Sequence, residues 1–162
     1  MNIIINFFEE NFTNQMAIFL LSMFPLIELK GAIPLGISLG LGYFESTIIS
    51  YIGSMLPVPL IFFTIRKIFK FLHRYDFYDK LVNKLVDRTL KKGDRIKKKG
   101  LLGLFIFVAI PLPGTGIWSG TLIANLLDIR FKHAFITIAL GNMVAGVIIF
   151  LISSGIIKIF DF

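Results

Sequence analysis

Two long uncharged stretches, each interrupted near its middle by proline and glycine, lie on either side of one strongly basic segment. The interruptions span 24–36 and 109–120. Their helix-breaking residues are Pro25, Gly31, Pro34 and Gly36 in the first and Pro111, Pro113, Gly114, Gly116 and Gly120 in the second. So much proline and glycine excludes a continuous helix through either stretch. Broken backbone at membrane depth persists only where it is buried in protein or lines a cavity.

Composition places the chain among all-α integral membrane proteins. Its 162 residues are 56% hydrophobic and include 18 phenylalanines, which leaves a soluble fold too little polar surface. Only 46–65 and 134–157 offer the roughly 20 uninterrupted residues of a spanning helix. The first ten residues contain two glutamates and no Lys or Arg, so we expect no cleavable secretory signal. The absence of cysteine excludes disulfides, thiolate metal sites and a thiol nucleophile.

The net charge of +7 is concentrated in segment 66–99, which has thirteen Lys or Arg residues against four Asp. By the positive-inside rule this segment faces the cytoplasm, where it also meets anionic lipid headgroups. A nucleic-acid surface is the alternative, but beside spanning helices we expect no nucleic-acid partner. Helical spacing of apolar residues and acid-first i,i+4 pairs predict a helix up to about Leu90.

The two halves resemble each other at an offset of 88 residues. Ile52-Gly53-Ser54-Met55 aligns with Leu140-Gly141-Asn142-Met143, and with a two-residue gap Pro25 meets Pro111. Each half therefore reads as a re-entrant helical hairpin, over 16–44 or 100–127, followed by a transmembrane helix.

The orientation of the other segments follows from the cytoplasmic position of the basic segment. Helix 46–65 then runs from outside to inside, so the first hairpin enters from outside and the second from the cytoplasm. Two copies of one plan in opposite orientation form the inverted-topology architecture of many secondary transporters. Apolar residues spaced four apart predict an amphipathic interfacial helix over 1–15. We expect a single multi-pass domain over 1–162.

Glu28 is the first candidate for a substrate or proton site, because a carboxylate inside a bilayer marks such a path by default. Lys30 lies two residues away, and i,i+2 side chains on a helix do not face each other, so the two pair only if the backbone is unwound. Gly31 and Pro34 favour that unwinding. The alternative is a buried ion pair that only holds the hairpin tip together.

The second interruption is uncharged and suits an anion. Pro111, Pro113, Gly114 and Gly116 free backbone N–H groups, and a half-helix that starts near Ile117 points its positive end into the membrane. The hydroxyls of Thr115 and Ser119 add hydrogen-bond donors, and the indole of Trp118 could cover the site. The alternatives are a tight glycine-rich hairpin tip and an ordinary packing tryptophan.

The remaining polar groups favour structural roles. Asn142 aligns with Ser54, and both could hydrogen-bond the interrupted segments. Arg130 either pairs with Asp128 or reaches toward lipid phosphate at the inner face. His73 and His133 lie apart from any carboxylate cluster, so we expect no metal and no other cofactor. No arrangement of serine, histidine and acid suggests hydrolysis, and we expect no enzyme.

The motifs Glu28-Leu29-Lys30-Gly31-Ala32-Ile33-Pro34-Leu35-Gly36 and Ile110-Pro111-Leu112-Pro113-Gly114-Thr115-Gly116-Ile117-Trp118-Ser119-Gly120 resemble the paired signatures of a bacterial family, the putative small multi-drug export proteins. That family is similar in turn to the DedA (VTT-domain) superfamily. The resemblance implies two opposed re-entrant hairpins, the bacterial cytoplasmic membrane, and a link to undecaprenyl phosphate movement or proton-dependent drug resistance. DedA-type second hairpins bear arginines for lipid phosphate, and 100–127 has none.

The leading hypothesis is a small transporter or flippase for an amphipathic substrate, with Glu28 as proton carrier. A lipid phosphate such as undecaprenyl phosphate is slightly favoured over a lipophilic cationic drug, because half-helix ends and Lys30 make the tips positive. A structural membrane protein that binds a partner through 66–99 and a passive channel or scramblase are the alternatives. Two helices and two hairpins would form only a thin wall around a transport path, which predicts a homo-oligomer, with a dimer as the first expectation.

Overall fold

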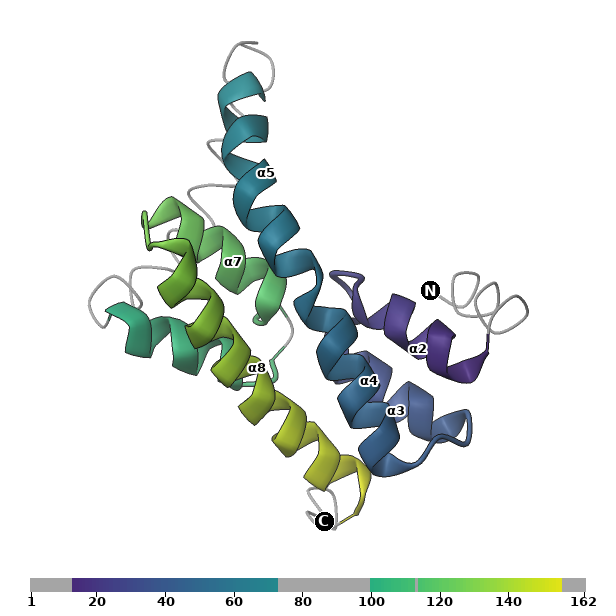
Figure 1. The fold of residues 1–162 in the computed structure, drawn as a ribbon. Coiled ribbons are helices and arrows are strands. Elements are labelled where there is room, and N and C mark those ends of the chain that lie inside the picture. The colour runs from purple at the N-terminus through teal and green to yellow at the C-terminus, as the bar shows by residue number, and fades with distance from the viewer. Residues whose placement is uncertain (1–12, 73–99, 113, 156–162) are drawn as a thin grey trace. The chain divides into compact units, whose positions relative to one another are not determined.

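The computed structural model describes residues 13–72, 100–112 and 114–155, and every regular element in these ranges is a helix (Figure 1). The predicted all-α class is therefore confirmed for this part of the chain. The helices are α2 (Asn14–Ser22), α3 (Glu28–Ser38), α4 (Tyr43–Met55), α5 (Pro57–Leu72), an unlabelled helix Gly100–Ala109, α7 (Ile117–Leu126) and α8 (Phe131–Ser153). The predicted interfacial helix and the predicted helix of the basic segment lie almost wholly outside the described residues.

Among the described residues, two helices are long and apolar enough to cross a membrane. One runs through α4 into α5 over Tyr43–Ile65, and the other is α8, each with 23 residues. At 1.5 Å per residue each is about 34 Å long, slightly more than the roughly 30 Å hydrocarbon core of a bilayer. The other helices, α2, α3, α7 and Gly100–Ala109, have nine to eleven residues. Their length of about 15 Å is half of that core.

The bounds of these elements repeat at the offset found in the sequence. Adding 88 to the first residue of α4, Tyr43, gives the first residue of α8, Phe131. The same shift moves the last residue of α3, Ser38, onto the last residue of α7, Leu126.

The ends of α3 and α7 are also closed by the same hydrogen bonds. After α3 the Leu41 N–H donates to the Gly36 carbonyl at 3.0 Å, and after α7 the Ile129 N–H donates to the Ala124 carbonyl at 2.9 Å. The residue before each donor has left-handed backbone, Gly40 with φ 88° and Asp128 with φ 55°. A left-handed residue with such a bond is a common way to end a helix.

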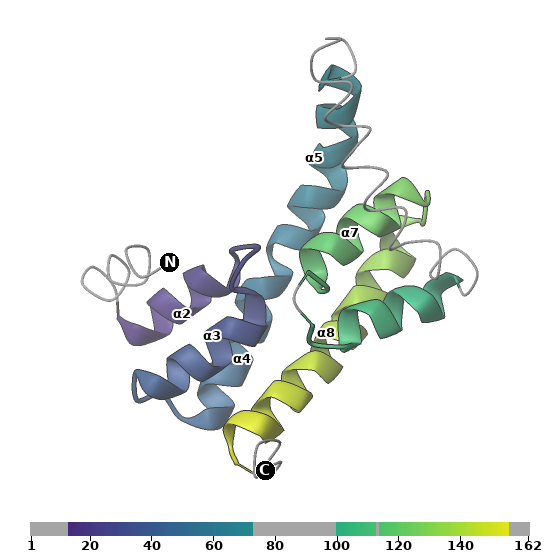
Figure 2. The ribbon, with the colours of Figure 1, turned by 180° about the vertical axis from the view of Figure 1, so that it is seen from behind.

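One compact unit comprises Met1–Pro57 with Asn142–Phe162. In it α2 and α3 pack along α4, as both views show (Figures 1 and 2). The approach of α4 to α2 requires glycine at position 53, because a Cβ there would overlap the Phe19 carbonyl oxygen and the Ser22 hydroxyl. Leu29 and Ile33 of α3 are fully buried against Ala145 of α8.

The other unit comprises Val58–Gly141 and contains Gly100–Ala109, α7, most of α5 and the first part of α8. Gly141 of α8 sits against the helix Gly100–Ala109, where a Cβ would lie 2.9 Å from both the Phe105 carbonyl oxygen and the Val108 Cβ. Gly53 and Gly141 are 88 positions apart, and each lies against the carbonyl of a phenylalanine, Phe19 of α2 or Phe105 of Gly100–Ala109.

Candidate functional site

Glu28 begins α3 in an unusual backbone conformation. Its φ is 49°, in the left-handed region, and the residue is only 5% exposed. Its N–H donates to the Phe24 carbonyl at 2.9 Å and so closes the turn that joins α2 to α3. A non-glycine residue held in left-handed backbone costs roughly 1–3 kcal/mol, and such strain is concentrated at functional sites.

Glu28 and Lys30 form an ion pair, with the Lys30 Nζ 3.4 Å from the Glu28 Oε2. Their side chains are 7% and 17% exposed, respectively, so the pair is largely buried. In a regular helix residues two apart point in different directions. The left-handed backbone of Glu28, the first residue of α3, lets them meet, whereas the predicted unwinding at Gly31 and Pro34 is wrong, because both residues lie inside the continuous helix Glu28–Ser38.

Two other predicted site residues shape the same helix. Gly31 lies under Ile27, whose Cγ2 would be 3.1 Å from a Cβ at that position. Pro34 lies inside α3 and cannot donate the hydrogen bond that would otherwise close a turn on the Lys30 carbonyl. α3 therefore begins at a left-handed residue and contains a proline within its regular helix.

The second interruption, 109–120, has left-handed residues directly before α7. Gly114 has φ 77° and Gly116 has φ 133°, and Gly116 is the N-cap of α7. The Thr115 hydroxyl lies 2.7 Å from the Ile110 carbonyl and 2.8 Å from the Leu112 carbonyl, so it serves the turn. Pro113 lies outside the described residues.

The first turn of α7 carries the other candidates of this break. Trp118 and Ser119 are half-buried, whereas Ile117 before them is fully buried. Pro111 is also half-buried. The structure thus gathers the described candidates of the second break in one compact unit, and Glu28, Lys30, Gly31, Pro34 and Asn142 in the other.

Asn142 of α8 and Ser54 of α4, which align at the offset of 88, hydrogen-bond each other. The Asn142 Nδ2 donates to the Ser54 Oγ at 2.9 Å, and both residues are buried. The Ser54 hydroxyl also lies 2.9 Å from the Tyr51 carbonyl of its own helix. Both side chains were candidates to bond the interrupted segments, and this bond instead joins α8 to α4.

Residues 28–148 match the family described as putative small multi-drug export protein. The chain belongs to this family. The match begins at Glu28 and includes 28–36 of the first interruption and all of the second, so it covers the residues on which the resemblance was based. No curated protein and no solved structure matches the chain. With two helices of membrane-spanning length and composition, this member of the small multi-drug export family is a membrane protein.

Several buried polar residues of this family member were missed by the sequence reasoning. Ser46 donates to the Ile33 carbonyl at 2.8 Å and ties α4 to α3, and the Asn125 amide donates to the Phe62 carbonyl at 2.6 Å. Within the described residues Ser50 is a buried hydroxyl that has no hydrogen-bond partner. The regular spacing of Ser46, Ser50 and Ser54 by four residues could have indicated a polar face on this helix.

Proposed function

We propose that the protein is a secondary transporter that exports amphipathic molecules across the membrane in exchange for protons, with Glu28 as the proton carrier. The observation that carries this proposal is the buried Glu28–Lys30 pair, held on left-handed backbone in an otherwise apolar hairpin. A charged side chain at the centre of a spanning helix costs roughly 2.5–3.5 kcal/mol on insertion scales. A carboxylate retained at such a cost is expected to act on ions, protons or substrate.

The pair provides two states that a proton can select. With Glu28 ionised, Lys30 holds the carboxylate and the start of α3 is fixed. A proton on Glu28 removes the attraction, and the strained turn can relax. A lipophilic cation could replace Lys30 as the partner of the ionised carboxylate, so that proton and substrate compete for one site. This competition is the chemistry of a proton-coupled exporter of cationic drugs, and the family description supports the drug-export part of this proposal.

The architecture that we propose is the inverted repeat of two re-entrant hairpins, similar to the plan of the DedA superfamily. Helices of about 15 Å reach only halfway across the hydrocarbon core. The turns between them carry apolar residues that water would not favour, Leu26 with 88% exposure and Leu112 with 55%. The repeated helix bounds, helix caps and glycine contacts support two copies of one plan.

Charge supports the orientation within this proposal. Segment 66–99, with thirteen basic and four acidic residues, belongs on the cytoplasmic side of the bacterial inner membrane, where Arg130 and Lys132 would also lie. The two hairpins then enter from opposite faces. Two spanning helices enclose little space, and a homodimer would complete the wall of a transport path.

Flipping of a lipid phosphate such as undecaprenyl phosphate is the second candidate function. The observation in its favour is the pair of left-handed glycines, Gly114 and Gly116, directly before the first turn of α7. Such backbone can present N–H groups to an anion at a helix N-terminus. The contact of Lys30 with Glu28 counts against this candidate, because the carboxylate neutralises the charge that was expected to attract phosphate.

Transport by purified protein in liposomes tests the proposal. A proton gradient should drive accumulation of tetraphenylphosphonium, and Glu28→Gln should abolish the part that depends on the gradient. Glu45→Gln is the matched control, because Glu45 is exposed and accepts a hydrogen bond from Gln15 at 2.8 Å. Gradient-driven transport by Glu28→Gln at the unaltered rate would refute the role of Glu28. Movement of a fluorescent polyprenyl phosphate without movement of the cation would favour the second candidate.

A further inference from the structure

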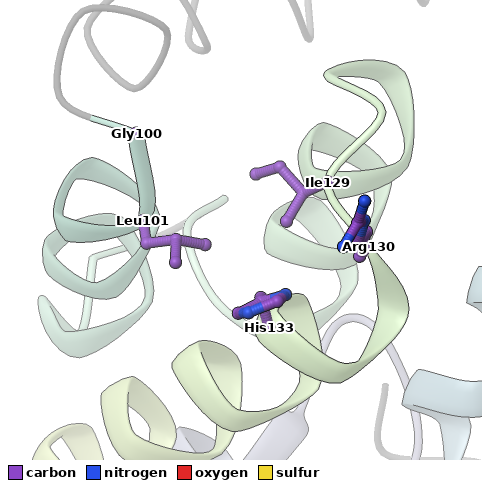
Figure 3. Close-up of a pocket in the computed structure, with 5 residues that line it drawn as sticks. All are labelled: Gly100, Leu101, Ile129, Arg130 and His133. Carbon is purple, nitrogen blue, oxygen red and sulfur yellow. The ribbon is translucent and has the colours of Figure 1, made fainter.

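A hollow of about 400 Å³ opens where the helix Gly100–Ala109 lies beside the loop between α7 and α8. Its lining residues are Gly100, Leu101, Ile129, Arg130 and His133. Figure 3 shows Leu101 on one side and Ile129, Arg130 and His133 on the other. The volume lies within the range of about 300–1,000 Å³ that is usual for ligand pockets. No residue of this hollow takes part in the proton exchange proposed above.

The chemistry of the lining is divided between a cationic and an apolar part. Arg130 and His133 supply N–H donors, whereas Leu101 and Ile129 supply aliphatic surface. Within the described residues no carboxylate lies at ion-pair distance from the Arg130 guanidinium, and Arg130 is exposed. An arginine in this setting can give two parallel hydrogen bonds to a phosphate group.

The position of the hollow along α8 fits this chemistry. Arg130 directly precedes α8 and His133 lies in its first turn. Because α8 is only a few ångströms longer than the hydrocarbon core, its first turn lies at the depth of the lipid headgroups. A phosphate there can meet Arg130 while its apolar chains lie against Leu101 and Ile129.

We propose that this hollow binds a phosphorylated amphiphile, with the phosphate on Arg130 and His133 and the apolar part against Leu101 and Ile129. The phosphate chemistry could come from a lipid headgroup or from free phosphate. The aliphatic half of the lining favours the lipid. The site is separate from Glu28, and its occupation does not depend on whether the protein transports drugs.

Binding to the purified full-length protein in a non-ionic detergent tests the proposal by calorimetric titration. The probes are short-chain phosphatidic acid, the matching phosphatidylcholine, and inorganic phosphate. We expect saturable binding of phosphatidic acid, with Kd raised about tenfold by Arg130→Gln, since charge-assisted bidentate hydrogen bonds are the strong ones. Lys132→Gln is the matched control, because Lys132 is exposed on the same turn, carries the same charge and does not line the hollow. It should change Kd less than twofold.

Three results would overturn the proposal. If Lys132→Gln and Arg130→Gln weakened phosphatidic acid binding equally, general surface charge alone would account for the binding. Phosphatidylcholine that binds as tightly as phosphatidic acid would exclude recognition of the anionic phosphate. Inorganic phosphate with the affinity of phosphatidic acid would exclude a role for the apolar lining. Because Arg130 is exposed, its variant should keep the wild-type helical content by circular dichroism, and Glu28→Gln should leave the lipid affinity unchanged.

Discussion

Removal of Lys30 should destabilise the protein more than removal of both members of the ion pair. At 3.4 Å the Lys30 and Glu28 charges attract each other. At an effective dielectric constant of about 20 this attraction is about 5 kcal/mol before desolvation is subtracted. Loss of one partner from a buried pair costs roughly 3–5 kcal/mol, because the other charge stays buried alone. Since 17% of the Lys30 side chain is exposed, the lower end of that range is expected for Lys30→Met.

The assay is a double-mutant cycle of Lys30→Met, Glu28→Gln and the double variant. The free energy of unfolding is measured by SDS titration of the purified protein, with far-UV circular dichroism as the signal. The double variant carries no buried charge, so it should recover about 2 kcal/mol of the loss caused by Lys30→Met. A coupling energy below about 0.5 kcal/mol, the value of an exposed pair, would refute the reasoning. Glu45→Gln should stay within about 0.5 kcal/mol of the unaltered protein, as for an ordinary surface change.

Three further predictions concern packing and topology. Gly53→Ala should lower the free energy of unfolding by about 1–3 kcal/mol, because its Cβ would overlap α2. Gly42→Ala, whose nearest neighbour would be 3.9 Å away, should change it little in the same SDS titration. Asn142→Leu should cost about 0.6–1.7 kcal/mol through the lost interhelical hydrogen bond, and an unchanged stability would contradict that bond. The chain has no cysteine, so Glu45→Cys and Lys132→Cys can be labelled singly in intact cells and inverted vesicles. An impermeant maleimide should reach them from opposite faces, and labelling of both from one face would contradict the inverted topology.

The sequence predicted two interruptions of the helical stretches, but it placed the first over 24–36, whereas α3 is helical from Glu28, and it did not predict the ends of the long helices. The predicted span 46–65 begins after the charged Glu45, whereas α4 begins at Tyr43. Glu45 is exposed in the first turn, where an acidic residue is favourable and can reach water. The predicted span 134–157 likewise begins three residues after α8, whose first turn carries the exposed Lys132 and His133.

At the C-terminal end of α8, the difference between the predicted and the observed bound has another cause. The apolar run continues to residue 157, but the helix ends at Ser153 because Gly155 has φ 72°. Hydropathy does not reveal that a glycine takes left-handed backbone and ends the helix.

The sequence predicted the candidate site residues that lie close together in the chain, and it missed contacts between residues that are far apart in the chain. A carboxylate and a lysine two residues apart between prolines can be recognised in the sequence, and the structure pairs them. The amide of Asn125, by contrast, bonds a carbonyl that lies 63 positions earlier in the chain. Only the packing of α7 on α5 brings these groups together.

The two breaks share a backbone plan but differ in chemistry, and this difference is the strongest argument for placing the function at Glu28. The offset of 88 that relates α3 to α7 sets Glu28 against Gly116, and both residues have left-handed backbone. Glycine adopts this conformation without steric penalty, whereas a residue with a Cβ pays roughly 1 kcal/mol or more. Stability alone would favour glycine at both positions. A glutamate that accepts backbone strain as well as burial, and whose charge Lys30 offsets, is what the proposed role of its carboxylate would explain.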